Sequence, residues 1–195
     1  MSGPLRILIL SCSLKRESRS RILAIKASEF LHAQGVEARL VDMREVALPE
    51  YGREDYAQSV VVQQLTQEIA WANGIIIATP IYNWSVNSVL KKVVEATGAD
   101  ETGRKIRAWE DKVVTFLCNA GVAQAYLAYL PTANSLMVDY KCIINPHVLF
   151  GVEADFEDGK LVNQDVAKRL ERVLSIAIEL IDALKDRKLL SGWVL

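Results

Sequence analysis

The sequence predicts an α/β protein in which a doubly wound parallel sheet of five strands lies between two layers of helices. Short apolar runs alternate along the chain with segments of helical periodicity, as is typical of parallel sheets with crossover helices. The runs at residues 7–10 and 74–78 have the apolar character of strands that are buried on both faces. The 195 residues suit a single domain over 1–195. At this size the strand order 2-1-3-4-5 is the natural choice.

Each expected strand is a short apolar or alternating run, and each expected helix repeats apolar residues every three or four positions. Turn-rich or charged stretches at residues 42–57 and 98–109 are expected to be loops, and Gly35 signals the end of the first helix. The expected strands are 7–10, 36–41, 74–78, 112–118 and 142–144, with 148–150 as an extension after Pro146. The expected helices are 20–34, 60–72, 86–96, 123–138 and 163–188.

The charge balance argues against a polyanionic partner. The chain has 23 basic and 24 acidic residues and a formal net charge of −1, so nucleic-acid binding is not expected. The same balance disfavours a strongly acidic electron carrier, which would find basic partners through its field. The apolar run after Met1 is too short for a signal peptide or a membrane span. We therefore expect a soluble cytoplasmic protein without membrane association.

The metal-ligating residues are few and scattered. Cys12, Cys118 and Cys142 are far apart and odd in number, and His32 and His147 are the two histidines. No C-x-x-C motif is present. A disulfide framework and a zinc site are therefore both disfavoured, and no metal is expected.

The loop after the first strand carries hydroxyls and positive charge instead of glycine. Residues 11–20 contain Ser11, Ser13, Ser18 and Ser20 together with three basic residues, and they contain no glycine. A dinucleotide fingerprint needs glycine for close approach of the backbone to a pyrophosphate. Hydroxyls, cations and the start of a helix instead suit a terminal phosphate monoester. The alternative for any single serine is that it caps the helix. The basic residues are Lys15, Arg16 and Arg19.

The loop after the third strand has the features of a platform for a flat ring. It begins with a Thr-Pro turn at residues 79–80, in which proline removes one donor and stiffens the chain. The backbone amides that follow are free to bond the edge of a ring, and Tyr82 and Trp84 add aromatic surface. We expect Asn83 or Ser85 to start the next helix. In a doubly wound sheet this loop and the first one can meet at the carboxyl edge, where ligands bind.

Together the two segments resemble the NADPH-dependent FMN reductase family of flavodoxin-like proteins, which includes azo-dye, quinone and chromate reductases. The first family motif resembles G-S-L-R-x-x-S-x-N, and residues 12–20 read C-S-L-K-R-E-S-R-S. The second resembles T-P-E-Y-N-x-S-x-P-G-x-L-K-N, and residues 79–92 read T-P-I-Y-N-W-S-V-N-S-V-L-K-K. In this chain Asn87 and Ser88 stand where the family has Pro-Gly. The resemblance implies a flavodoxin-like fold.

The resemblance also implies FMN as cofactor, NADPH or NADH as co-substrate, and a small-molecule acceptor such as a flavin, a quinone or an azo compound. No general acid or base is assigned, because the flavin carries the chemistry. The implied phosphate contacts are Ser13, Lys15, Ser18 and Ser20, to which the loop itself adds Ser11. The implied ring contacts are Pro80, Ile81, Tyr82 and Asn83, with Asn119 and Gly121 after the fourth strand.

Three questions stay open at this point. Low-molecular-weight tyrosine phosphatases use C-x5-R in the same loop, but Ser18 stands where the arginine belongs. A non-enzymatic electron carrier or flavin-binding interaction module is the alternative function. Family members are commonly homodimers or homotetramers, and the candidate interface aromatics, each of which could equally be core or plain surface, are Trp84, Tyr126, Tyr129 and Trp193.

Overall fold

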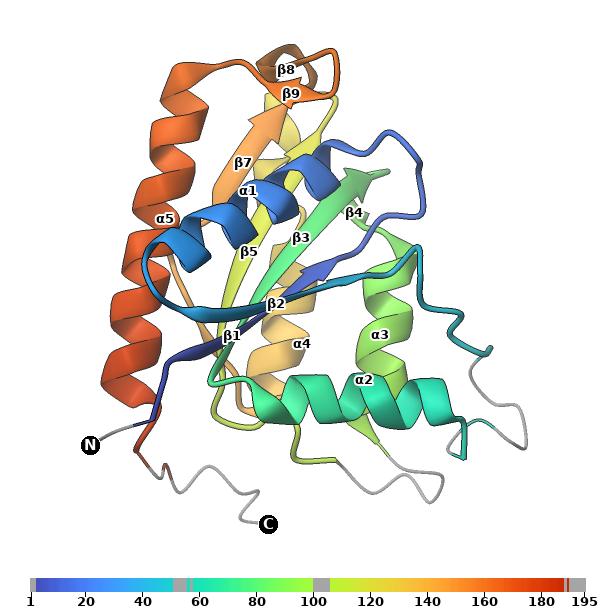
Figure 1. Ribbon diagram of the computed structural model, residues 1–195. Coiled ribbons are helices and arrows are strands. Elements are labelled where there is room, and N and C mark those ends of the chain that lie inside the picture. The colour runs from blue at the N-terminus through green and yellow to red at the C-terminus, as the bar shows by residue number, and fades with distance from the viewer. Residues whose placement is uncertain (1–2, 51–55, 57, 100–105, 188, 190–195) are drawn as a thin grey trace.

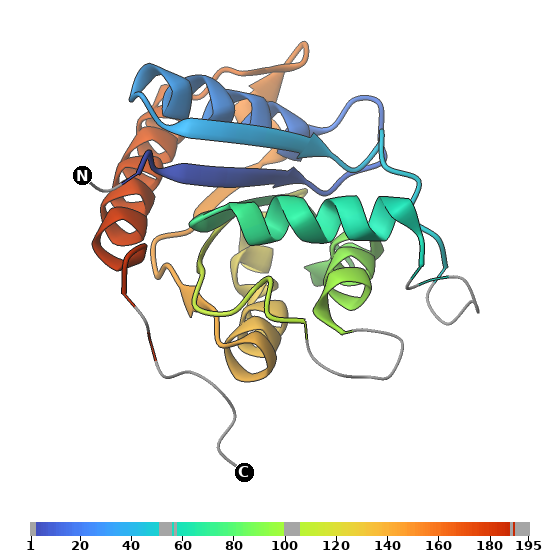
Figure 2. The same ribbon diagram turned by 60° about the horizontal axis from the view of Figure 1, so that its bottom comes forward.

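A computed structural model describes residues 3–50, 56, 58–99, 106–187 and 189. A twisted parallel sheet runs through the centre, with helices on both faces (Figures 1 and 2). Its order is β2-β1-β3-β5-β6, and β7 also pairs with β5, which confirms the predicted order. The strands are β1 (Arg6–Ser11), β2 (Glu37–Asp42), β3 (Gly74–Tyr82), β4 (Ser85–Val86), β5 (Val113–Ala120), β6 (Ile143–Ile144) and β7 (Leu149–Val152), with the separate hairpin β8 (Phe156–Glu157) and β9 (Lys160–Leu161).

The helices cover the two faces unequally. Helices α1 (Arg19–Ala33) and α5 (Gln164–Leu184) lie on one face, whereas α2 (Val60–Trp71), α3 (Ser88–Gly98) and α4 (Leu130–Tyr140) lie on the other (Figure 2). Successive side chains of β1 alternate between the two cores: Leu8 and Leu10 pack toward α2 and α3, while Ile7 and Ile9 pack toward α1 and α5. All four are fully buried, so the apolar run at 7–10 is explained by burial on both faces.

Proline interrupts two of the predicted elements, one of which differs from the prediction. The helix expected at 123–138 is a 3-10 turn, η1 (Ala123–Leu127), followed by α4, which begins at Leu130. Pro131 lies in the first turn of α4, where its missing N–H costs nothing, so the helix restarts there. The last strand is split into β6 and β7, which flank Pro146 and both pair with β5, as the predicted extension after Pro146 implied.

The predicted Thr-Pro turn is wrong, because β3 continues through Thr79 and Pro80 to Tyr82. Pairing with β1 ends at Ala78, and beyond it β3 pairs in parallel with β5 alone. A residue without an N–H is tolerated on such an unpaired side. The chain turns at Asn83 and Trp84, which both have positive φ (50° and 62°) in a two-residue hairpin to β4.

Asn87, and not Asn83 or Ser85, begins the helix after β3. Its Oδ1 accepts from the backbone N–H of Leu90 (3.1 Å) and from the Thr79 hydroxyl (3.4 Å). Its Nδ2 donates to the carbonyl of Cys12 at the end of β1. One buried amide therefore caps α3 and ties the ends of β1 and β3 together.

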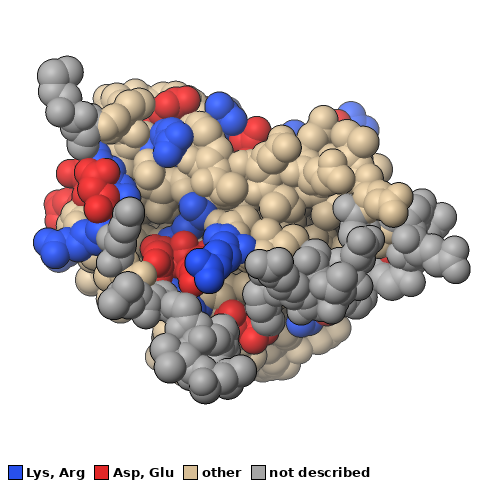
Figure 3. Space-filling model, turned by 90° about the horizontal axis from the view of Figure 1, so that it is seen from below, with Lys and Arg blue, Asp and Glu red and all other residues tan. Residues whose placement is uncertain are grey.

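The face at the amino-terminal edge of the sheet carries both signs of charge. Seen from below, described acidic and basic side chains lie beside one another rather than in a field of one sign (Figure 3). Among the described residues, no helix combines the length and apolarity needed to cross a membrane.

All three cysteines are buried in the apolar interior. Burial raises the pKa of Cys118 and Cys142 to about 12. It raises the pKa of Cys12 further, and the nearby Asp42 charge adds to this. Since the thiolate is the nucleophile, none of the three is activated.

We expect the native protein to show no thiol reactive toward Ellman's reagent at pH 8, and three after unfolding in denaturant. The measurement is thiolate release followed by absorbance, with and without denaturant. Rapid modification of Cys12 in the folded protein would contradict the burial of this thiol.

The second prediction concerns Asn87. Asn87→Ala removes a helix cap and leaves the Cys12 carbonyl without its donor, so the free energy of unfolding should fall by about 2–4 kcal/mol. Asn87→Asp keeps the capping oxygen but not the amide donor, and it isolates the second contribution. Urea unfolding of the three proteins measures both. If the alanine variant were as stable as the parent, Asn87 would not hold these elements together.

Candidate functional site

A cavity of about 890 Å³ opens at the carboxyl edge of the sheet. It lies where the β1–α1 loop, the ends of β3 and β5, and the β8–β9 hairpin come together. This is the edge at which open α/β sheets bind ligands. The residues that line it come from four segments: 15–19 with Arg21, Ile22 and Ile25; 80–82; 119–121; and Glu153 with 156–159.

The β1–α1 loop brings a helix N-terminus to this cavity. Ser18 caps α1 by accepting from the backbone N–H of Arg21 (3.4 Å), and its hydroxyl lies 2.9 Å from that of Ser20. Lys15, Arg16 and Ser18 line the wall. The free N–H groups and the positive end of the helix dipole therefore face the same space as two cationic side chains.

Three of the expected serines lie behind this wall. Ser11, Ser13 and Ser20 are buried and do not line the cavity. Ser13 accepts from the backbone N–H of Lys15 (3.4 Å), so it shapes the loop. The Ser11 hydroxyl, at the end of β1, is buried with no partner among the described residues.

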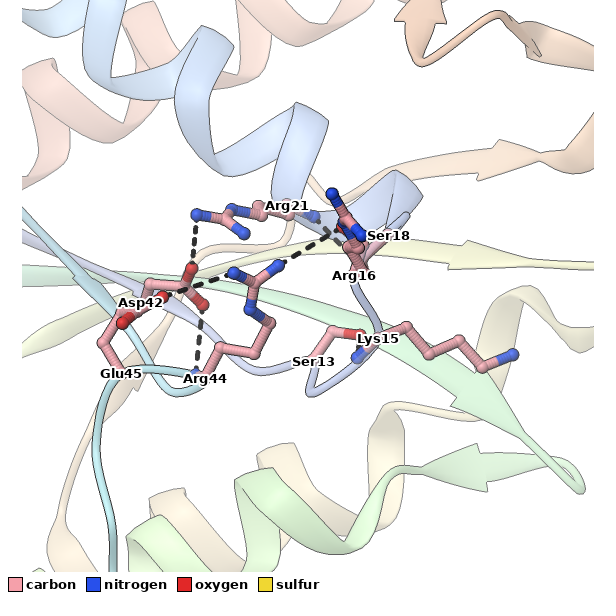
Figure 4. Close-up of polar contacts among 8 residues, drawn as sticks. All are labelled: Ser13, Lys15, Arg16, Ser18, Arg21, Asp42, Arg44 and Glu45. Carbon is pink, nitrogen blue, oxygen red and sulfur yellow. Dashed lines mark hydrogen bonds and ion pairs between the residues drawn. The ribbon is translucent and has the colours of Figure 1, made fainter.

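One ion pair and two hydrogen bonds hold the loop from the side of β2. Arg21 Nη2 lies 2.8 Å from Asp42 Oδ2, and Asp42 Oδ1 accepts from the backbone N–H of Arg44 (3.2 Å). Arg44 in turn reaches the carbonyl of Arg16 (3.5 Å). Lys15 points away from this group, toward the β3–β4 hairpin (Figure 4), where its Nζ lies 5.1 Å from the centre of the Tyr82 ring. No sequence motif indicates that Asp42 and Arg44 hold the loop in place.

The ends of β3 and β5 form the opposite part of the wall. Pro80 and Asn119 are register partners, so the two strand ends lie side by side. Pro80, Ile81 and Tyr82 line the cavity, whereas Asn83 lies in the turn beyond it. Asn119 is 6% exposed, and its Oδ1 has no partner among the described residues. Gly121 also lines the cavity, and a Cβ at this position would meet no atom within 4 Å.

The β8–β9 hairpin is a part of the site that the sequence analysis missed. Asp158 and Gly159 have positive φ (45° and 72°) and connect two short antiparallel strands. An Asp-Gly pair is a strong hairpin signal when apolar and polar residues alternate on both sides of it. Residues 156–161 read F-E-D-G-K-L, so this element could have been predicted from the sequence. The buried Asp155 holds it by accepting from the Val152 N–H (2.7 Å) and from Asn163 Nδ2 (2.7 Å), while Asn163 caps α5.

The candidate interface aromatics differ in exposure. Trp84 is 66% and Tyr126 56% exposed. Tyr129 instead packs against Phe116, with ring centroids 5.1 Å apart. Trp193 lies outside the described residues.

The comparisons with known proteins agree on the fold. FerB, an NAD(P)H:(acceptor) oxidoreductase of Paracoccus denitrificans, superposes with a TM-score of 0.74 at 18% identity, over 92% of this chain and 98% of FerB. The NAD(P)H:quinone oxidoreductase of Methanothermobacter marburgensis gives 0.61 at 19% identity, over 91% and 98%. At these identities the likeness is one of fold, and it confirms the flavodoxin-like prediction.

Sequence relatives and a family model carry the assignment. The NADPH-dependent FMN reductase ArsH of Shigella flexneri is 26% identical over 125 residues, which are 64% of this chain and 48% of ArsH, so the match spans about half of that relative. The FMN reductase (NADPH) of Pseudomonas aeruginosa is 21% identical over 87% of this chain and 89% of its own. The model of the NADPH-dependent FMN reductase family matches residues 5–155. The chain therefore belongs to the NADPH-dependent FMN reductase family, whose cofactor is FMN and whose electron donor is a reduced nicotinamide.

Proposed function

We propose that this chain is an NAD(P)H-dependent oxidoreductase that holds FMN in the cavity at the carboxyl edge and reduces small acceptors such as free flavins, quinones or azo compounds. The observation that carries the proposal is that one cavity joins the cationic β1–α1 loop to the ends of β3 and β5. With a quinone as acceptor, the quinone, NAD(P)H and one proton react to give the hydroquinone and NAD(P)⁺.

The phosphate of FMN fits the end of the cavity at the start of α1. Lys15 and Arg16 are exposed, and neither side chain forms an ion pair with another described residue. Together with the N-terminus of α1 and the Ser18 hydroxyl they offer donors to a dianion. The ion pair of Arg21 with Asp42 holds the loop without using these two cations.

The ring of FMN fits the end formed by β3 and β5. Pro80 and Ile81 are buried and belong to β3, so they give a fixed apolar edge. Asn119 supplies a buried Oδ1 that still lacks a donor, and the ring N–H of a flavin is such a donor. When bound, FMN supplies the hydride-accepting ring, while these residues orient it and limit its exposure to water.

A direct test uses the purified chain with added FMN. It should bind FMN, and it should oxidise NADPH or NADH in the presence of an acceptor only when FMN is bound. Absence of FMN binding at micromolar concentrations would overturn the proposal. A stabilised one-electron state without turnover of nicotinamide would point to the alternative, an electron carrier.

Replacement of Lys15 tests whether this side chain contacts the phosphate of FMN. Lys15→Met should raise the dissociation constant of FMN about tenfold, because a charge-assisted contact to the phosphate is lost. Binding of riboflavin, which lacks the phosphate, should change little. Lys168→Met removes an exposed charge from α5, away from the cavity, and serves as the control. Quenching of flavin fluorescence measures all three proteins. If the variant lost affinity for FMN and for riboflavin equally, Lys15 would not contact the phosphate.

A further inference from the structure

The charges that line the cavity are divided between two walls. Four of these residues are basic and all come from the β1–α1 segment: Lys15, Arg16, Arg19 and Arg21. Four are acidic, and three of those come from the segment that carries the β8–β9 hairpin: Glu17, Glu153, Glu157 and Asp158. The carboxylates of this acidic wall would repel a phosphate, so phosphate binding does not explain them.

Some of these charges are already compensated. Arg19 forms an ion pair with Glu153 across the cavity, and Arg21 forms one with Asp42. Glu157 and Asp158 are exposed at the tip of the hairpin, and Lys160 is the register partner of Glu157 across it. Within the described part of the chain neither acid forms an ion pair with a cation of the opposite wall. A phosphate monoester carries a charge between −1.5 and −2, which matches the two cations left, Lys15 and Arg16. With FMN in place, the remaining uncompensated charge of the cavity is negative.

The acidic wall is held rigidly. Asp155 accepts from Val152 N–H and Asn163 Nδ2, and its carbonyl accepts from the backbone N–H of Val162 (2.9 Å). Phe156 packs on Gly151, where a Cβ would come within 3.2 Å of its ring. The two-residue turn at Asp158 and Gly159 then fixes where the carboxylates project. The backbone at the tip of the hairpin is therefore fixed next to the cavity, and both carboxylates project from it.

We propose that Glu157 and Asp158 bias the choice of acceptor by charge, so that within one chemical class of planar acceptor the uncharged member is reduced in preference to its anionic counterpart, as with a quinone and its sulfonate. This inference rests on the proposed function, because it concerns the acceptor that shares the FMN cavity. The independent sign that the cavity takes a ligand is Asn119, which lines it and whose buried Oδ1 lacks a partner.

The test removes the two charges without changing the turn. Glu157→Gln and Asp158→Asn are combined in one variant. Asparagine readily adopts the positive φ of position 158, so the turn is kept. The acceptors are 1,4-naphthoquinone and its 2-sulfonate. Because the two quinones differ in reduction potential, the quantity compared is the ratio of their kcat/KM values in the variant relative to the parent.

We expect this ratio to shift toward the sulfonate by about sixfold at low ionic strength, since each of the two unit charges at about 8 Å in water contributes a factor of about 2.4. The shift should shrink as salt is added. Binding of naphthalene-2-sulfonate to the FMN-loaded protein, followed by the change in flavin absorbance, should tighten by a similar factor relative to 2-naphthol.

The control is Glu171→Gln with Glu179→Gln, which removes two exposed acids of α5 that do not line the cavity. An equal shift in the control, or no shift in the variant, would overturn the charge-selection role. If the double variant does not fold, Glu157→Gln alone keeps the Asp-Gly turn and should give about half of the effect on a logarithmic scale. If the parent protein binds FMN and turns over, but the variant shows no shift in the kcat/KM ratio, this inference alone is refuted. If the parent protein binds no FMN, the proposed function is refuted.

Discussion

The side-chain amide of Asn87 is the interaction on which the geometry of the site depends. The sheet brings the ends of β1 and β3 to one edge, but it does not fix the chain beyond them. Asn87 does so by donating to the Cys12 carbonyl while it accepts from Leu90 N–H and the Thr79 hydroxyl. An amide can donate and accept at the same time, which a carboxylate cap cannot do. The start of α3 and the path of the β1–α1 loop are therefore set together.

A second constraint is electrostatic. The loop that carries Lys15 and Arg16 is braced from outside by the Arg21–Asp42 ion pair and by Arg44 on the Arg16 carbonyl (Figure 4). Because other groups position the loop, these two cations stay available to an anion. A chain with a net charge of −1 can thus separate charge locally, with a basic and an acidic wall in one cavity.

The sequence predicted those elements whose formation depends on residues within the same segment. The apolar run at 7–10 is a strand because both of its faces are buried, and the strand order followed from length and alternation. The predictions failed where the conformation of a segment depends on a contact with a residue far away in the sequence. β3 passes through Pro80 only because β1 has already ended beside Ala78, and Asn87 bonds a carbonyl 75 positions away. The break before Pro131 and the Asp158-Gly159 hairpin do have local signals, proline at a helix start and an Asp-Gly turn. Apolar residues repeat at helical spacing on both sides of the break, which hides the first of these signals.

The arrangement of the site separates two tasks between different parts of the chain. The proposed cofactor contacts lie on the β1–α1 loop and on the ends of β3 and β5, and the sheet and Asn87 hold these parts together. The proposed acceptor contacts lie on the β8–β9 hairpin, which is attached through Asp155 to the cap of α5. Since the hairpin contributes no strand to the main sheet, its tip can change in charge or length without disturbing the register of the strands. In the proposed arrangement the same framework therefore keeps one cofactor, while the hairpin biases the choice of acceptor.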